Sequence, residues 1–123
     1  MRVFVVEDDR DLADLTSEAL RALGHTVAVA TNAPRALADI RTFVPDLVLV
    51  DIVLPVFDGN DLASTIRSRI TPAPRLVAMT AWKERVKSHL FDGVLAKPFS
   101  RRDLVHVLEP LSAAGSDDDD GQN

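Results

Sequence analysis

Short apolar segments alternate with amphipathic segments along the chain. Five apolar or nearly apolar segments have the length typical of buried strands: Val3–Val6, Thr26–Ala30, Leu47–Val50, Leu76–Met79 and Gly93–Ala96. Between them, apolar residues recur every three or four positions, as they do in helices that cover a sheet. Five strands alternating with five helices predict an α/β sandwich with a parallel sheet.

Capping residues indicate where several of these helices begin and end. Asn32 is a candidate N-cap, and Ser100 with Asp103 fits a capping box for the last helix. Gly24 is placed to end the first helix. The fourth helix would have to lie within Trp82–Leu90, which has room for only two or three turns.

Composition narrows the functional classes. The 123 residues suit one domain, which we expect to span residues 1–112, followed by a disordered tail or linker over 113–123. The net charge of −5 comes mostly from Asp117–Asp120, so the body carries about −1 and lacks the basic excess of a nucleic-acid binder. Without cysteines or a long apolar run, we expect a cytoplasmic protein that does not contact a membrane.

Polar side chains follow four of the five predicted strands. Glu7 and Asp8 come after the first strand, Asp51 after the third, Thr80 after the fourth and Lys97 after the fifth. Because sites in parallel sheets lie at the carboxyl ends of the strands, we expect these groups to meet at one edge.

Three carboxylates at one edge need positive charge nearby. Two unit charges about 5 Å apart repel by roughly 3 kcal/mol at an effective dielectric of 20. Oxygen ligands select Mg²⁺, Mn²⁺ or Ca²⁺, and Mg²⁺ beside a lysine and a hydroxyl suits phosphoryl transfer. No glycine-rich phosphate loop is present in the sequence, so nucleotide binding is not implied. A carboxylate could instead accept the phosphoryl group itself.

Five motifs in this order resemble the receiver domains of two-component response regulators: Val5-Val6-Glu7-Asp8-Asp9, Pro45-Asp46-Leu47-Val48-Leu49-Val50-Asp51, Leu54-Pro55 with Asp58-Gly59, Met79-Thr80-Ala81 and Lys97-Pro98-Phe99. The resemblance covers Val3 to Leu111. It implies a doubly wound, flavodoxin-like (βα)5 three-layer sandwich with strand order 2-1-3-4-5 and a shortened fourth helix.

The resemblance also implies a role for each site residue. Asp51 would be the phosphoacceptor and would take part in binding Mg²⁺, or Mn²⁺ in its place. Asp8 would bind the metal directly and Glu7 directly or through water, and the backbone carbonyl of Val53 would be a further ligand. Lys97 would pair with the acceptor carboxylate and then with a phosphoryl oxygen.

Switching and partners follow from the same resemblance. Thr80 would bond the phosphoryl group and draw its loop inward, and the Lys97–Pro98 bond would be cis. The donor would be a histidine kinase or a histidine phosphotransfer protein, and the target a downstream protein or output domain. We therefore expect a phosphorylation switch that is not a turnover enzyme, a monomer or weak dimer without direct nucleic-acid contact.

Three departures from the family pattern stand out. Val94 replaces the aromatic residue that usually lies three positions before the lysine. The stretch from Thr80 to Lys97 is shorter than usual, which leaves the fourth helix short or partly unwound. Val53 and Trp82 occupy the positions two after the acceptor and two after the threonine, where we expect them to cover the acyl phosphate and slow its hydrolysis.

Two other functions remain compatible with the sequence. A binding module that works without phosphorylation would keep the fold, although the complete acceptor, acid, threonine and lysine set argues against it. A Mg²⁺-dependent phosphohydrolase would pass through an aspartyl phosphate. Such enzymes usually carry a second acid two residues after the nucleophile, and Val53 occupies that position here.

Overall fold

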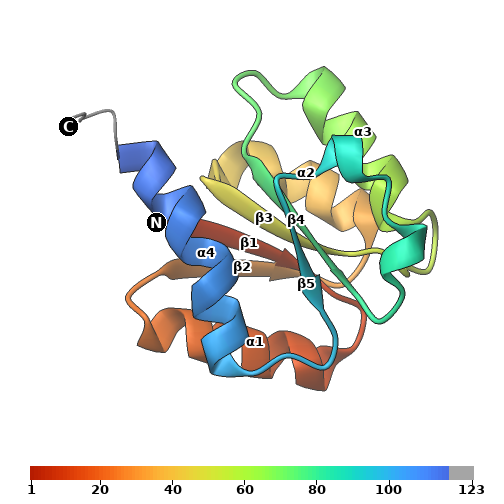
Figure 1. Ribbon diagram of the computed structural model, residues 1–123. Coiled ribbons are helices and arrows are strands. Elements are labelled where there is room, and N and C mark those ends of the chain that lie inside the picture. The colour runs from red at the N-terminus through yellow and green to blue at the C-terminus, as the bar shows by residue number, and fades with distance from the viewer. Residues whose placement is uncertain (117–123) are drawn as a thin grey trace.

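A parallel five-stranded sheet forms the centre of the molecule (Figure 1). The computed structural model describes the backbone of residues 1–116 and the side chains of residues 1–111. The strands lie in the order β2-β1-β3-β4-β5, as the family resemblance implies. Their bounds are β1 Arg2–Val6, β2 Thr26–Ala30, β3 Leu47–Asp51, β4 Arg75–Thr80 and β5 Gly93–Ala96.

Four α-helices cover the two faces of the sheet (Figure 1). On one face lie α1 (Arg10–Ala22) and α4 (Arg101–Ser116), and on the other lie α2 (Ala33–Phe43) and α3 (Gly59–Arg69). The predicted three-layer, doubly wound sandwich is therefore confirmed.

The central strands are apolar without interruption because both of their faces are covered. In β1, Val3 and Val5 pack with α1 and α4, whereas Phe4 and Val6 pack with α2 and α3. All residues of β3 are buried. A strand with two buried faces has no need for the polar alternation of a half-exposed strand.

The predicted caps of Asn32 and of Ser100 with Asp103 are present, and Asp9 caps the first helix as well. The side chains of Asp9 and Asn32 accept hydrogen bonds from backbone N–H groups in the first turns of α1 and α2. Ser100 and Asp103 bond each other's backbone N–H, as in a capping box.

The expected fourth helix is absent from the described residues. Between β4 and β5 the chain forms two separate 3₁₀ turns, η1 (Lys83–Arg85) and η2 (Ser88–Leu90). The expectation of a short or unwound segment is confirmed, but that of α-helical turns is wrong. None of residues 81–89 is buried, so this stretch lacks the apolar face that would stabilise a helix against the sheet.

The last helix is longer than the sequence suggests. It continues past Pro110 to Ser116, four residues beyond the expected domain end at 112. The domain boundary stays a prediction, and residues 117–123, including Asp117–Asp120, lie outside the described residues. Within the described part of the chain, no helix is long and apolar enough to span a membrane.

Candidate functional site

The carboxyl edge of the sheet gathers the predicted site residues. Glu7 and Asp8 follow β1, Asp51 ends β3, Thr80 ends β4 and Lys97 follows β5. The arrowheads of these strands point toward the same edge in Figure 1. The fold thus brings together side chains that are up to 90 residues apart in sequence, as in the pair of Glu7 and Lys97.

Lys97 lies between two buried carboxylates. Its Nζ is 2.7 Å from Oε1 of Glu7 and 3.1 Å from Oδ2 of Asp51. Burial alone would lower the pKa of Lys97, but the hydrogen bonds and negative charges of the two acids outweigh it and raise the pKa. The ammonium therefore stays charged and can donate to oxygen atoms at this edge.

Glu7 is unusually deep for a carboxylate. Its side chain is 1% exposed, and burial raises its pKa to about 7, with the neighbouring Asp51 adding to the shift and Lys97 opposing it. Its Oε2 also accepts a hydrogen bond of 3.2 Å from the backbone N–H of Asp9. Positive charge nearby would favour the ionised form of this group.

Three carboxylates are close enough to share a cation. Glu7, Asp8 and Asp51 each place one oxygen within 4.8 Å of the others. In octahedral Mg²⁺ sites, bonds of about 2.1 Å put opposite oxygens about 4.2 Å apart. The all-oxygen donor set suits a hard divalent cation, which would draw the three oxygens slightly closer together, and the exposed Asp8 leaves the site open on one side.

Asp51 is fixed by a hydrogen bond to its carboxylate and by close packing against its backbone. It is 5% exposed, and its Oδ1 accepts a 3.0 Å hydrogen bond from the backbone N–H of Val53. Gly59 packs against its backbone: a Cβ at this position would lie 2.4 Å from the carbonyl oxygen of Asp51. The Asp58-Gly59 motif is thus explained by the Asp58 cap of α3 and by this close approach.

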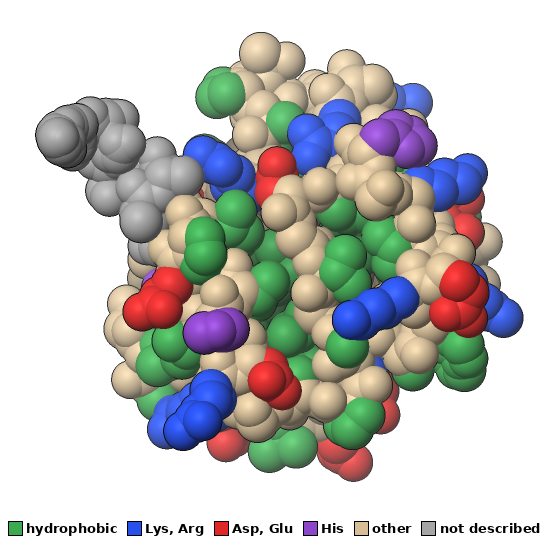
Figure 2. Space-filling model, in the orientation of Figure 1, with side chains coloured by type: hydrophobic (Ala, Val, Ile, Leu, Met, Phe, Trp, Pro, Cys, Tyr) green, Lys and Arg blue, Asp and Glu red, His purple; other side chains and the backbone are tan. Residues whose placement is uncertain are grey.

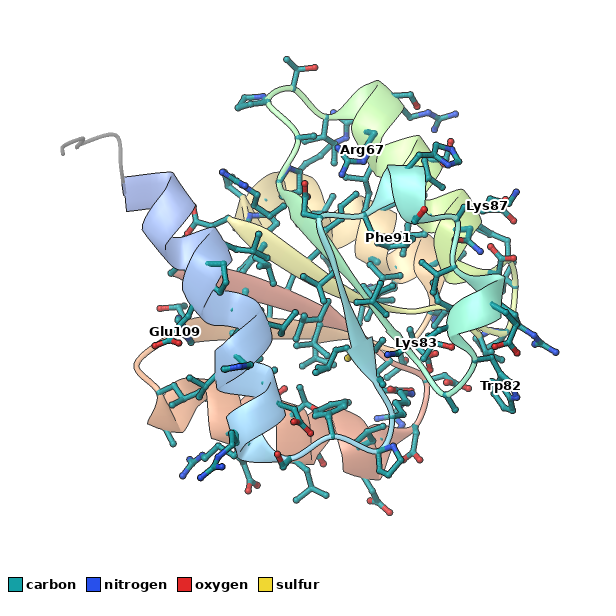
Figure 3. All side chains as sticks on the ribbon, viewed as in Figure 1. Arg67, Trp82, Lys83, Lys87, Phe91 and Glu109 are labelled. Carbon is teal, nitrogen blue, oxygen red and sulfur yellow. The ribbon has the colours of Figure 1, made fainter. Side chains whose placement is uncertain are left out.

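Thr80 is buried under its own loop. Its side chain is 1% exposed, and Oγ1 accepts a 2.8 Å hydrogen bond from the backbone N–H of Trp82. Trp82 itself is 48% exposed and lies against the guanidinium of Arg85, at the edge of the molecule in Figure 3. In this conformation about half of the tryptophan surface is open to solvent, and its role in covering the acyl phosphate stays a prediction.

The Lys97–Pro98 peptide bond is cis, as the family resemblance implied.

One buried polar residue beside the site is not among the residues predicted from the sequence. Asn60, in the first turn of α3, is 4% exposed and bonds the chain on both sides of Val86. A polar residue near a helix start usually indicates solvent exposure, so periodicity alone could not have singled it out.

Comparisons with known proteins agree with this geometry. Residues 3–109 match the family model described as response regulator receiver domain. The sensory transduction protein RegX3 of Mycobacterium tuberculosis is 32% identical over 120 residues, covering 95% of this chain and 53% of that protein. The transcription factor SKN7 of Saccharomyces cerevisiae is 38% identical over 111 residues, covering 86% of this chain and 18% of that protein. The chain thus spans about half or less of these relatives.

Solved structures show the same architecture. A receiver domain from Methylobacillus flagellatus superposes with a TM-score of 0.84 at 26% identity, covering 90% of this chain and 98% of that one. The response regulator TrrA of Thermotoga maritima, solved in complex with Mg²⁺ and beryllofluoride, gives 0.82 at 26% identity and covers 89% of this chain and 97% of that one. The fold, the acidic edge with its lysine and the family match agree, and the chain belongs to the response regulator receiver domains of two-component systems.

Proposed function

We propose that Asp51 accepts a phosphoryl group from a phosphohistidine donor in a Mg²⁺-dependent reaction. The observation that carries this proposal is the position of the Asp51 carboxylate, which lies 3.1 Å from Lys97 and beside the carboxylates of Glu7 and Asp8. In this setting a cation and the ammonium can neutralise both the attacking carboxylate and the incoming phosphoryl oxygens.

In the proposed reaction, an Asp51 carboxylate oxygen attacks the phosphorus of the phosphohistidine. The new P–O bond forms as the P–N bond breaks, and the imidazole of the donor takes a proton from water and leaves neutral. The product is an acyl phosphate on Asp51. The hydrogen bond from the Val53 N–H to Oδ1 holds the carboxylate in one orientation for this attack.

We assign Mg²⁺, or Mn²⁺ in its place, to the carboxylates of Glu7, Asp8 and Asp51 and the backbone carbonyl of Val53. The all-oxygen donor set within 4.8 Å supports this assignment. When bound, the cation would withdraw negative charge from the phosphoryl oxygens.

Lys97 and Thr80 have separate roles in the proposal. Lys97 holds Asp51 before the reaction and then donates to a phosphoryl oxygen, because its ammonium has three protons and remains charged. Thr80 turns its hydroxyl proton toward the phosphoryl group and carries its loop inward, while Oγ1 can still accept from Trp82.

The domain would act as a switch rather than as a turnover enzyme. Its donor would be a histidine kinase or a histidine phosphotransfer protein in the cytoplasm, and the switched surface would control a downstream protein or an output domain. Direct nucleic-acid binding is not part of the proposal, because acidic and basic side chains are interspersed over the face in Figure 2.

The test is intact mass after incubation with Mg²⁺ and phosphoramidate, whose P–N bond resembles that of phosphohistidine. We expect one phosphoryl adduct on the wild type and none on Asp51→Ala or on wild type with excess chelator. A protein that takes up no phosphoryl group would instead be a phosphorylation-independent binding module. Repeated turnover of the donor without a lasting adduct would indicate a phosphohydrolase.

A second variant tests Lys97. Lys97→Met keeps much of the side-chain length but removes the ammonium, so the rate of adduct formation should fall by roughly a hundredfold, the usual effect of losing one charge-stabilising donor. Arg35→Met is the matched control, because Arg35 pairs with the exposed Asp39 of the same helix. Equal rates for Lys97→Met and Arg35→Met would contradict the role given to Lys97.

A further inference from the structure

The segment between β4 and β5, residues 81–92, has few contacts of its own to fix its position. Over residues 81–91 its backbone hydrogen bonds close only single 3₁₀ turns, such as Arg85 N–H to Trp82 O and Leu90 N–H to Lys87 O, whereas the N–H of Asp92, its last residue, bonds the carbonyl of Leu76 in β4. Among the described hydrophobic residues of the segment, only Leu90 and Phe91, near its C-terminal end, pack against the core. The first part of the segment is therefore positioned by polar contacts.

Helix α3 supplies those contacts through two side chains seven residues apart, which lie on one face of a helix. In the middle of the segment, Nδ2 of Asn60 donates to the carbonyl of Arg85 over 2.8 Å, and Oδ1 accepts from the N–H of Lys87 over 2.9 Å. Near its end, Nε of Arg67 donates to the carbonyl of Leu90 over 2.6 Å. Figure 3 shows Arg67 and Lys87 at this junction of α3 and the segment.

Asn60 is firmly attached to the acceptor end of the sheet. The preceding Gly59 donates its N–H to the carbonyl of Ile52 over 2.8 Å and packs against the backbone of Asp51. Asn60 is itself buried, and both polar atoms of its amide are used by the segment. Because Asn60 is anchored, its amide cannot follow a movement of the segment. Such a movement would therefore break both hydrogen bonds.

The other end of the same stretch is attached to Thr80. The N–H of Trp82 bonds Oγ1 of Thr80, and Arg85, three residues later, is bonded by Asn60. If Thr80 moves toward Asp51 and keeps its bond to Trp82, the chain between Trp82 and Arg85 has to shift relative to Asn60, which stays anchored beside Gly59. The two attachments thus compete.

We propose that Asn60 is a positioning residue that restrains the segment in the unphosphorylated state and so opposes the inward movement of Thr80. This inference rests on the proposed function of Asp51. It gives this domain, in which Val94 stands in β5, a restraint built from a side-chain amide. Loss of the amide bonds should favour the switched conformation, because only the resting state contains them.

The experiment titrates beryllofluoride with Mg²⁺, a phosphoryl mimic, and follows the fluorescence of Trp82, the only tryptophan in the chain. Asn60→Leu keeps the approximate size of the side chain and removes both hydrogen bonds. We expect beryllofluoride to bind roughly threefold to tenfold more tightly than to the wild type, the factor expected from one or two lost bonds. Thr65→Ala is the control, because its hydroxyl bonds only Asp61 of α3, and its affinity should match the wild type.

A second pair of variants leaves α3 unchanged. Lys87→Pro and Lys87→Ala both remove the ammonium, but only proline removes the N–H that bonds Asn60. The backbone accepts proline here, since Lys87 has φ −83° and Val86 is extended. Lys87→Pro should therefore bind beryllofluoride more tightly than Lys87→Ala, and this comparison decides the matter if Asn60→Leu does not fold.

The outcomes separate the two proposals. No response of the wild type, together with no phosphoryl adduct, overturns the proposed function and this inference with it. A normal wild-type response with unchanged or weaker binding by Asn60→Leu and by Lys87→Pro, each relative to its control, overturns the restraint alone. Tighter binding by either variant, with wild-type affinity in Thr65→Ala, supports it.

Discussion

At the scale of single residues, Gly59 shows how a motif depends on close packing. An added Cβ would lie 2.4 Å from the Asp51 carbonyl oxygen, 2.8 Å from Cγ1 of Val50 and 2.9 Å from Cα of Ile52. Two of these atoms belong to the backbone of the strand end that carries the acceptor, so they cannot move without displacing Asp51.

We therefore predict that Gly59→Ala destabilises the fold by roughly 1–3 kcal/mol, the usual cost of overpacking. It should also slow phosphorylation by phosphoramidate. Urea unfolding measures the first effect and intact mass the second. Ser64→Ala, at an exposed position of α3, should change stability by less than about 0.5 kcal/mol. A Gly59→Ala variant as stable as Ser64→Ala would contradict the packing argument.

His25 gives the fold a dependence on pH that is separate from the site. Burial lowers its pKa from the ordinary value of 6.5, and the N-terminal ammonium, 3.0 Å from Nδ1, lowers it further. A histidine with a lowered pKa binds its proton more readily in the unfolded chain. Stability should therefore be lost as the pH falls below about 6.5.

The prediction is that His25→Gln flattens the decrease in unfolding free energy between about pH 7 and about pH 5. Urea unfolding at several pH values measures this slope. His89→Gln serves as the matched control, since it removes a histidine from the exposed surface. If both variants flatten the slope equally, the effect does not come from the surroundings of His25.

At the scale of elements, we expect the loops after β3 and β4 to determine how well the proposed acyl phosphate is shielded from water. Val53 follows Asp51 closely and donates its N–H to the acceptor, whereas Trp82 lies against Arg85 at the edge of the molecule. Val53 is 44% exposed, so its side chain is not enclosed by the surrounding residues.

We predict that Val53→Asn accelerates dephosphorylation, because a polar side chain beside the acyl phosphate can position water for attack. Trp82→Glu should accelerate it less, since the half-exposed Trp82 ring packs against Arg85. The measurement is loss of the mass adduct after removal of the donor, with Val56→Asn, an exposed valine, as control. No acceleration in either variant would refute the idea that these residues protect the phosphoryl group.

The elements also show what could be predicted from the sequence. Strands buried on both faces have continuous apolar runs, so β1 and β3 and the acids at their ends were predictable. The segment over residues 81–92 was harder, because its position depends on Asn60 and Arg67 from a distant helix. Polar residues that bond a neighbouring backbone have no periodic pattern that distinguishes them from polar residues facing water.

At the scale of the whole molecule, most of the net negative charge lies in the run Asp117–Asp120, apart from the carboxylates of the proposed site. The full chain has a net charge of −5, and Asp117–Asp120 contribute −4 of it, so the rest carries −1. The three acids of the site lie at one sheet edge, beside the ammonium of Lys97. The largest run of acids in the sequence is therefore separate from the acids to which we assign the chemistry.

We predict that a chain ending at Ser116 keeps the stability and the phosphorylation rate of the full chain, although its net charge changes from −5 to −1. The reason is that both core clusters and every predicted site residue lie before that point. Thermal unfolding and the intact-mass assay are the measurements, at low and moderate salt, since screening would remove a long-range effect of the lost aspartates. A lower midpoint, or a rate that differs only at low salt, would show that the acidic run acts on the domain.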